Sequence, residues 1–363
     1  MYKEISASPL RVLVVVIVAC CLFTMLSTYG IPFFTVVLGG CISNAMAWSQ
    51  NSSNTHINYT TVKGYFLQDE HSTNVSSFNF ITSNFGLINQ TYNGSAASPD
   101  ETQWQYFAKQ VKQLNKKASP NVHYKVLFMG RHGEGYHNAA ETYYGTPAWN
   151  CYYSELDGNS TVTWADAHLT PNGVTQALAV NKFWASEIEN QKIPLPQSYY
   201  TSPLTRCLAT ANLTFSGLKL RPKHPFIPTV KELFREGISG HTCDRRSSKT
   251  YVQNNFPTYK IEEGFTENDQ LWEALHGETN TDQDIRSKAV LDDVFSSDKS
   301  TYISITSHSG EIASILRGKS PIRLLFACDM LTIRCSIGPP TLLLEYRSRD
   351  PSSRKSGDDR GRS

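Results

Sequence analysis

Two histidines that follow strand-like runs are the residues whose chemistry can be interpreted most directly. His132 comes after Arg131 and the apolar run 125–130, and His308 comes after the β-branched run 301–306. A neutral imidazole can attack phosphorus as a nucleophile, and the planar guanidinium of a neighbouring arginine binds phosphoryl oxygens. Open α/β sheets bind their ligands at the carboxyl ends of the strands. We therefore expect both histidines at one anion-binding site.

A second arginine and two carboxylates are further candidates for this site. Arg206 ends the sequence Thr-Ser-Pro-Leu-Thr-Arg, where a predicted strand (198–202) passes into a predicted helix. The free N–H groups of a helix start already favour anions, and the arginine adds a full positive charge there. A departing alkoxide needs a general acid, and the segment 230–246 offers Glu232 and Glu236 for that role.

Three stretches of the chain resemble motifs of a known family. The stretch 131–138, RHGEGYHN, resembles the signature of the histidine phosphatase superfamily, specifically its phosphoglycerate-mutase-like branch. The stretches 166–177 and 201–206 are similar to the DxxLTxxGxxQA and TSPLxR motifs of that family. The resemblance covers about residues 65–317 and is strongest to the fungal phosphoglycerate-mutase-like proteins. The acid-phosphatase and phytase branch, with RHGxRxP, matches less well because Gly and His occupy its Arg and Pro positions.

The resemblance implies an α/β fold, a three-layer α/β/α sandwich with a mostly parallel central sheet. It implies that His132 forms a phosphohistidine and that Glu236 is the general acid, because the spacing from Glu236 to Gly240 matches the family's Glu-x-x-x-Gly. Glu232 is then a structural or surface carboxylate. The phosphoryl oxygens are expected to bind four side chains, those of Arg131, Asn138, Arg206 and protonated His308. No metal or other cofactor is expected, because these groups neutralise the phosphoryl charge.

Three residues near the predicted acid are left with two readings each. His241, Asp244 and Arg245 are either substrate-side or structural groups. For the reaction itself, a phosphomonoesterase acting on a small-molecule phosphate ester is favoured over a phosphoglycerate-mutase-type phosphomutase, because a secretory protein has little use for glycolytic intermediates. A hypothesis of another class is a catalytically inactive, membrane-tethered protein, disabled by its atypical C-terminus.

The N-terminal residues 1–48 form an apolar leader. Lys3 and Arg11 precede the apolar run 12–26, and a second run, 31–42, follows. This pattern is typical of a signal peptide or of a retained signal anchor, and a buried segment of a soluble protein is the remaining reading. We expect entry into the secretory pathway, with a secreted or membrane-anchored product, and a cytoplasmic protein as the alternative. Seven Asn-x-Ser/Thr sequons agree with a glycoprotein; they begin at Asn51, Asn58, Asn74, Asn89, Asn93, Asn159 and Asn212.

The rest of the chain is expected to form three regions. Residues 49–122 are a polar lead-in arm whose aromatic side chains dock on the main domain, with a short helix at 105–114, and residues 123–317 are the catalytic domain. In that domain the pattern predicts strands at 125–130, 198–202 and 301–306, and helices at 170–187, from 203, at 281–295 and at 311–317. One disulfide is possible among Cys151, Cys207 and Cys243, but the spacing does not name the pair.

The tail 318–363 departs from the family, which is expected to continue with a turn and a final strand. Residues 317–363 hold ten Lys/Arg and five Asp/Glu, which leaves 24 basic and 27 acidic residues from totals of 34 and 32. The basic balance therefore belongs to the tail, and no nucleic-acid partner is expected. Our hypothesis is a retained intron followed by a frame shift, since Gly318-Lys319-Ser320 is what a translated splice donor encodes. An irregular tail and the loss of a core strand are expected to follow.

Overall fold

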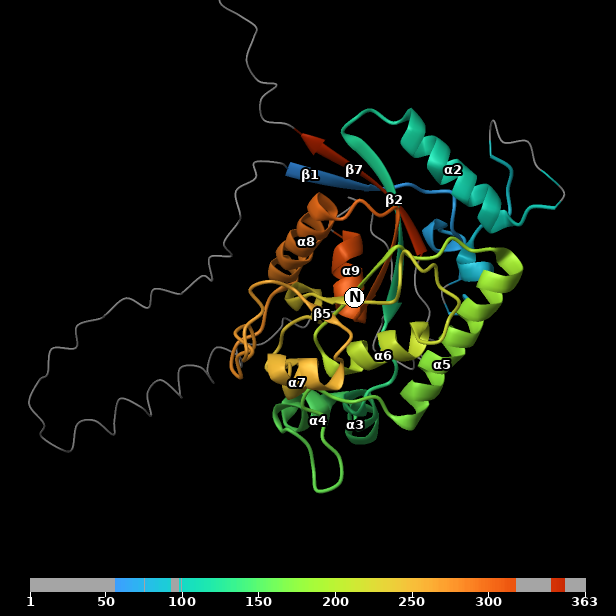
Figure 1. Ribbon diagram of the computed structural model, residues 1–363. Helices are drawn as coiled ribbons and strands as arrows, with labels where there is room; N and C mark the ends of the chain where they lie inside the picture. Colours follow the sequence, from blue (N-terminus) through green and yellow to red (C-terminus); the bar gives the residue numbers. More distant parts are fainter. Residues whose placement is uncertain (1–55, 75, 93–97, 99, 318–340, 350–363) are drawn as a thin grey trace, which may run out of the picture. The chain divides into compact units, whose positions relative to one another are not determined.

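A seven-stranded sheet, in the order β1-β7-β2-β6-β3-β4-β5, passes through the part of the chain that the computed structural model describes (Figure 1). That part comprises residues 56–74, 76–92, 98, 100–317 and 341–349. The predicted leader and its choice between signal peptide and anchor lie outside these residues. None of the helices within them is long and apolar enough to cross a membrane.

Five neighbouring strands of the sheet are parallel. They are β2 (Val122–Arg131), β6 (Tyr302–Ser307), β3 (Ser198–Thr201), β4 (Thr229–Val230) and β5 (Lys260–Ile261). The centres of β2 and β6 are buried, as expected for strands covered on both faces. In the register of these two strands Arg131 pairs with Ser307, so both end at the same level. This register brings the residues that follow them, His132 and His308, to one edge of the sheet.

Two antiparallel strands, β1 (His56–Thr61) and β7 (Thr341–Arg349), lie on the outer side of β2. Strand β7 pairs with β2 from Val122 to Phe128 and with the whole of β1. The expectation of an irregular tail is therefore wrong over residues 341–349. The run Thr-Leu-Leu-Leu-Glu-Tyr is rich in residues that suit strands, and the outer edge of β2 otherwise presents unpaired backbone groups. The suggested origin of the tail remains a hypothesis.

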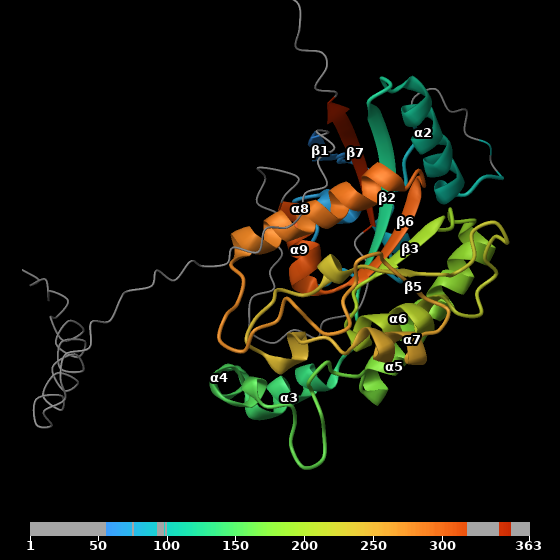
Figure 2. The same ribbon diagram turned by 60° about the vertical axis from the view of Figure 1, so that its left-hand side comes forward.

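Successive side chains of β2 pack against helices on opposite faces of the sheet. Leu127 and Met129 point into a core with α8 (Asn280–Ser297) and α9 (Ser309–Arg317). Val126 and Phe128 point to the opposite core, which is closed mainly by three further helices (Figure 2): α2 (Gln103–Lys117), α5 (Pro171–Ser186) and α6 (Thr205–Phe215). Because successive side chains of a strand face opposite sides, one apolar run builds both cores. The predicted three-layer α/β/α sandwich is confirmed.

The lead-in segment docks through its aromatic residues, as predicted. All seven of them belong to the core that α2, α5 and α6 close: Tyr65, Phe66, Phe78, Phe80, Phe85, Trp104 and Phe107. The Phe85 ring is 4.6 Å from that of Phe183 and 5.0 Å from that of Trp184, both on α5. Rings of this size contribute much of a core's apolar area. The same segment also supplies β1, which the sequence did not predict.

Local capping explains where the helices begin. The Thr170 side chain accepts a hydrogen bond from the Gly173 N–H, and Pro171 stands in the first turn of α5, as the sequence predicted. The predicted helix at 105–114 is the centre of α2, which begins with a reciprocal capping box between Thr102 and Gln105. Three shorter α-helices also lie within the described residues: α3 (Tyr136–Tyr144), α4 (Thr146–Cys151) and α7 (Lys249–Asn255).

Candidate active site

The imidazoles of His132 and His308 meet at the carboxyl ends of β2 and β6. Their ring centroids are 5.0 Å apart, with the ring planes at 62°. Both side chains are buried, at 3% and 0% relative exposure. The structure brings together the rings of two histidines that are distant in the sequence, and their shared catalytic role remains a prediction. The cause of this proximity is the strand register, because the His132 N–H donates to the Ser307 carbonyl at 3.0 Å.

The ring of His132 is held in one orientation by its own backbone. Its Nδ1 lies 2.7 Å from the carbonyl oxygen of Gly133. A carbonyl only accepts hydrogen bonds, so Nδ1 carries the proton and Nε2 keeps a lone pair. The loop is tight at this point, because a Cβ on Gly133 would lie 2.5 Å from the Gly173 carbonyl oxygen. A histidine in this tautomer is prepared for nucleophilic attack through Nε2.

Arg206 lies in the first turn of α6 and is completely buried. Its Nη1 donates to the Cys243 carbonyl at 2.6 Å, and its Nη2 is 3.6 Å from Asp244 Oδ1. Its Nε has no hydrogen-bond partner among the described residues, and the same holds for Nε of Arg131. Buried polar groups are normally paired. Two unpaired guanidinium N–H groups at one edge of the sheet suit an anionic ligand.

The helix start that carries Arg206 is fixed by Asp166. The Asp166 carboxylate accepts hydrogen bonds from the Thr205 N–H at 2.8 Å and from the Thr205 hydroxyl at 2.7 Å. It also accepts one from the Ser247 N–H at 3.0 Å. Asp166 was read from the sequence only as part of a family motif. The structure shows that it caps the helix that places the arginine.

Burial makes the histidines of the site neutral. The pKa values of His132, His137 and His308 lie well below the usual value, first because of burial and then because of the positive charge of Arg206. Arg131 lowers all three further. His308 is thus neutral in the anion-free protein, and its expected protonated state beside a bound phosphoryl group remains a prediction. A phosphate dianion between these groups would favour the imidazolium again.

His308 is also held by polar neighbours from the Thr-Ser-Pro-Leu-Thr-Arg stretch. Its Nε2 is 2.8 Å from the Ser202 hydroxyl and 3.3 Å from the Cys207 thiol. Burial raises the pKa of that thiol, so it remains protonated. Cys151, Cys207 and Cys243 are all unpaired, so none of the disulfides considered among them is formed.

Glu236 lies at the start of α9, directly beyond His308. Its Oε2 accepts a hydrogen bond from the Gly310 N–H at 3.3 Å, and its Oε1 accepts one from its neighbour's N–H, that of Gly237, at 3.0 Å. A Cβ on Gly310 would be 2.1 Å from Glu236 Oε1. The other candidate, Glu232, faces away into a buried pair of arginines. Its oxygens contact Arg235 Nη1 at 3.1 Å and Arg246 Nε at 2.7 Å.

These contacts distinguish the two glutamates. Glu232 is a structural carboxylate, because both of its oxygens hold arginines of the loop 230–246. The Glu236 carboxylate accepts a hydrogen bond from the Gly310 N–H in the first turn of α9, which follows His308. Its role as general acid remains a prediction.

Asn138 closes the turn of the RHGEGYHN stretch. Its Oδ1 accepts a hydrogen bond from the Gly135 N–H at 3.0 Å, which caps the start of α3. Only its Nδ2 hydrogens are then left for the predicted contact with a phosphate. Asn138 therefore has a structural role that the motif comparison did not suggest.

A third histidine, His137, was not predicted as part of the site. Its ring centroid is 5.4 Å from that of His132, and its buried Nδ1 has no hydrogen-bond partner among the described residues. One feature of the sequence could have indicated this position. A histidine in the first turn of a helix points back toward the loop before it, which here is the predicted ligand loop. That position had served only to reject the acid-phosphatase branch.

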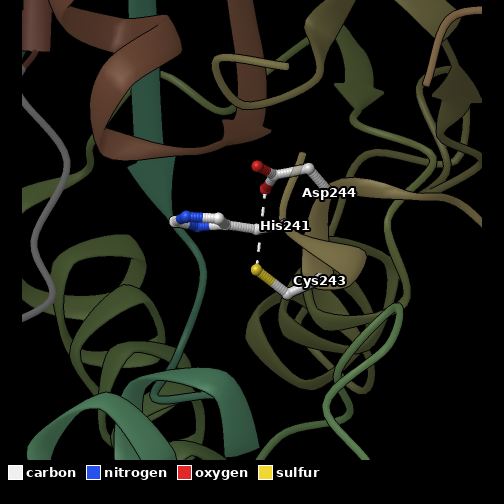
Figure 3. A group of neighbouring side chains, drawn as sticks. All are labelled: His241, Cys243 and Asp244. Carbon is white, nitrogen blue, oxygen red and sulfur yellow. Dashed lines mark hydrogen bonds between the residues drawn. The ribbon is translucent and has the colours of Figure 1, made fainter. Parts of the chain in front are cut away.

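A group of His241, Cys243 and Asp244 has ligand atoms within 4.8 Å of one another (Figure 3). The thiol and the carboxylate face each other, with Sγ and Oδ1 3.8 Å apart. This donor set does not suit a metal ion. The Asp244 carboxylate already accepts from the Ser239 hydroxyl and lies beside Arg206, and burial raises the thiol pKa of Cys243 well above normal. A metal cation would meet both a protonated thiol and a fixed guanidinium charge.

The three residues whose roles the sequence left undecided thus have different surroundings. Asp244 is structural, because it supports Arg206. Arg245 forms an ion pair with Asp157 at 2.6 Å, and its guanidinium lies over the Trp272 ring. Neither contact involves a histidine of the site. His241 is near the site, since its charge lowers the pKa of His137.

The chain is similar to several known proteins. The model of the histidine phosphatase superfamily (branch 1) matches residues 154–327. A probable phosphoglycerate mutase of Arthroderma benhamiae is 53% identical over 263 residues, which cover 72% of this chain and 78% of that protein. Phosphomutase-like protein 3 of Candida albicans is 32% identical, over 71% and 73% of the two chains.

A likeness to solved structures is present at low identity. The ecdysone phosphate phosphatase of Bombix mori is 16% identical, with a TM-score of 0.35 over 66% of this chain and 97% of that chain. A TM-score this low supports no inference about function.

Proposed function

The chain belongs to the histidine phosphatase superfamily, in its phosphoglycerate-mutase-like branch, and on that premise we propose that it hydrolyses a phosphate monoester through a phosphohistidine on His132. Family membership makes it a phosphoryl-transfer enzyme. The substrate class is a small-molecule phosphate ester. One observation carries the proposal. Two buried imidazoles lie 5.0 Å apart, and the adjoining Arg131 and Arg206 each have an unpaired guanidinium N–H.

The proposed first step transfers the phosphoryl group to the enzyme. Nε2 of His132 forms a bond to phosphorus while the P–O bond to the alcohol breaks, and Glu236 gives its proton to the departing oxygen. Arg131, Arg206 and His308 stabilise the charge on the equatorial oxygens. Fixed positive groups aimed at a transferring phosphoryl group are the main source of catalysis in such reactions.

The proposed second step releases phosphate. The Glu236 carboxylate takes a proton from water as the water oxygen attacks phosphorus and the P–N bond breaks. His132 and Glu236 return to their initial states, so the cycle is balanced. The neutral state of His132 favours the first attack, because a protonated imidazole has no lone pair at Nε2.

A phosphomutase is the second candidate, and the relative that is 53% identical favours it through its name. In a mutase the phosphohistidine returns the phosphoryl group to a second hydroxyl instead of to water. The two candidates share every residue named above. They differ only in whether water or substrate reaches the phosphohistidine.

Release of phosphate from p-nitrophenyl phosphate tests the proposal. We expect wild-type protein to release phosphate and His132→Ala to lose this activity, while His71→Ala, at an exposed loop histidine, keeps it. Equal activity of wild type and His132→Ala would overturn the proposal. Absence of activity in both would favour the inactive, membrane-tethered protein. Incubation with phosphoglycerate then separates the candidates, because a mutase yields the isomer and a phosphatase yields inorganic phosphate.

We also propose that the protein passes through the secretory pathway. Five sequon asparagines lie in the described residues, and all five are exposed: Asn58, Asn74, Asn89, Asn159 and Asn212. Exposure is required for glycan attachment. Protein from a secreting host should therefore shift in mass after treatment with an N-glycan hydrolase. Unshifted mass would contradict this localisation.

A further inference from the structure

A basic groove lies at the end of the sheet opposite to the histidines. It has a volume of about 630 Å³ and is lined by one face of α2, the segment 192–197, Arg221, Thr301 and the first residue of β6, Tyr302. In both views α2 lies beside the amino end of β2, whereas α3 and α4 lie at the other end (Figures 1 and 2). The groove is therefore separate from the phosphoryl site. Its volume is typical of a small-molecule site.

The charge of the groove is strongly positive. Four cationic residues line it from three separate parts of the chain, against one carboxylate, that of Glu101: Lys109, Lys112, Lys192 and Arg221. Residues 1–316 contain 24 basic and 27 acidic residues, so this stretch of the chain is acidic as a whole. Positive charge is thus concentrated at the groove, although residues 1–316 together carry a net negative charge. Such a field attracts anions.

Two of the four cationic side chains have no hydrogen-bond or ion-pair partner in the part of the chain that the structure describes. Lys109 pairs with Glu101, and Lys192 Nζ donates to the Glu189 carbonyl at 2.6 Å. The side chains of Lys112 and Arg221 make no hydrogen bond or ion pair within the described residues. They belong to different walls, Lys112 to α2 and Arg221 to the turn after α6. Two unpaired cations from separate parts of the groove's lining suit a ligand with at least two anionic groups.

The floor of the groove adds a hydrogen-bond donor. Burial raises the pKa of Tyr302, and the charge of Arg221 acts in the opposite direction, which places the guanidinium close to the phenol. The phenol remains protonated at neutral pH. The Gln197 side chain is occupied, since its Oε1 accepts from the N–H groups of Thr301 and Tyr302. Backbone contacts thus fix the floor, while the phenol and the two cations face the groove.

We propose that this groove binds a small soluble polyanion with two or more phosphoryl groups, at a site distinct from the catalytic one. Arginine and lysine are the side chains that bind phosphoryl oxygens, and the phenol donates one further hydrogen bond. The floor residue Tyr302 begins the same strand whose far end carries Ser307 and His308. The inference does not depend on the proposed hydrolysis, because it concerns binding at other residues.

Isothermal titration of the full chain with tripolyphosphate tests this site. The test variant is Lys112→Ala/Arg221→Ala. The matched control is Lys182→Ala/Lys260→Ala, which removes the same charge from exposed positions outside the groove. Each titration is run with and without orthovanadate, which competes for the phosphoryl site. We expect a binding event that persists with orthovanadate and is weakened at least about tenfold in the test variant only, about the loss expected for charge-assisted contacts.

Three outcomes would overturn the proposal. In the first, orthovanadate abolishes all binding, so that tripolyphosphate uses only the catalytic site. In the second, the test variant binds as the wild type does. In the third, the control variant weakens binding as much as the test variant, which would show a response to net charge alone. Activity toward p-nitrophenyl phosphate, measured in parallel, reports separately on the proposed function.

Discussion

The backbone N–H of His132 donates a hydrogen bond to the carbonyl oxygen of Ser307, the residue before His308. This bond continues the parallel register of β2 and β6 by one residue beyond the last strand pair. The two imidazoles are therefore positioned by the sheet itself and not by flexible loops. A site built on paired strands holds its groups more rigidly than one built on loops. The predictions below follow from this arrangement.

Gly310 is expected to be required for the position of Glu236. In Gly310→Ala the new Cβ would be 2.1 Å from Glu236 Oε1, so the carboxylate must move. We expect kcat to fall by about 10²–10⁴-fold for alkyl phosphates, the usual contribution of a general acid. The loss should be smaller for p-nitrophenyl phosphate, whose leaving group needs little protonation.

Gly237→Ala is the matched control for this prediction. A Cβ on Gly237 meets Gln283 at 3.6 Å, which is ordinary van der Waals contact. Its kcat should stay near that of the wild type for both substrates. Equal losses in the two glycine variants, or equal losses for both substrates, would remove Glu236 from the acid role.

Asp166 is expected to stabilise the start of α6. Asp166→Ala removes the acceptor for the N–H and the hydroxyl of Thr205, which should lower the free energy of unfolding by about 1–2 kcal/mol. It should also raise KM, because Arg206 follows in the same turn. Asp166→Asn keeps one acceptor oxygen and tolerates the backbone φ of 41°, so its loss should be smaller. Urea unfolding and steady-state kinetics measure both, and equal stability of the Ala variant and the wild type would contradict the capping role.

The histidines of the anion-free site should not titrate in the usual range. Burial and Arg206 lower the pKa values of His132, His137 and His308, so all three remain neutral at pH values where a free histidine becomes protonated. Their NMR ring signals should stay unchanged from about pH 8 to about pH 6, the range in which a free histidine titrates. Addition of orthovanadate should raise the pKa of His308. A normal titration of His132 without the anion would contradict this account.

Glu311 is expected to make stability depend on pH. Burial raises its pKa from 4.5 to about 8, so between these values the folded protein keeps a proton that the unfolded chain has lost. The contribution of this group to stability is therefore full below the unfolded pKa and declines as the pH rises toward 8. Glu311→Gln should flatten this part of the curve.

The test compares urea midpoints at about pH 5 and about pH 8. Glu155→Gln, at an exposed glutamate, is the control and should keep the pH dependence of the wild type. If Glu311→Gln shows the same decline as the wild type, the buried carboxyl is not its source.

The sequence predicted the elements whose burial or capping leaves a clear pattern. The apolar run of β2, the β-branched run of β6 and the cap of α5 at Thr170 are all found where expected. Strands β4 and β5 were not predicted, because two residues are too short to show a period. β7 was missed because its pairing partner, the outer edge of β2, lies more than two hundred residues away in the sequence.

The site was predicted as far as residue types and motifs allow. His132, Arg206 and His308 could be named from their positions after strands or at a helix start, and Glu236 from its spacing to Gly240. His137 could not, because its proximity depends on how α3 leaves the loop. The neutral state of His308 also could not, because it depends on burial and on the charge of Arg206 in three dimensions.

Trapping of the phosphorylated protein tests the central claim most directly. Wild-type protein, quenched in alkali during turnover of a phosphate ester, should gain the mass of one phosphoryl group in an acid-labile bond. Peptide mapping should place that group on His132, and His132→Ala should gain none. A phosphoryl group on another residue, or an adduct that persists in His132→Ala, would contradict the account.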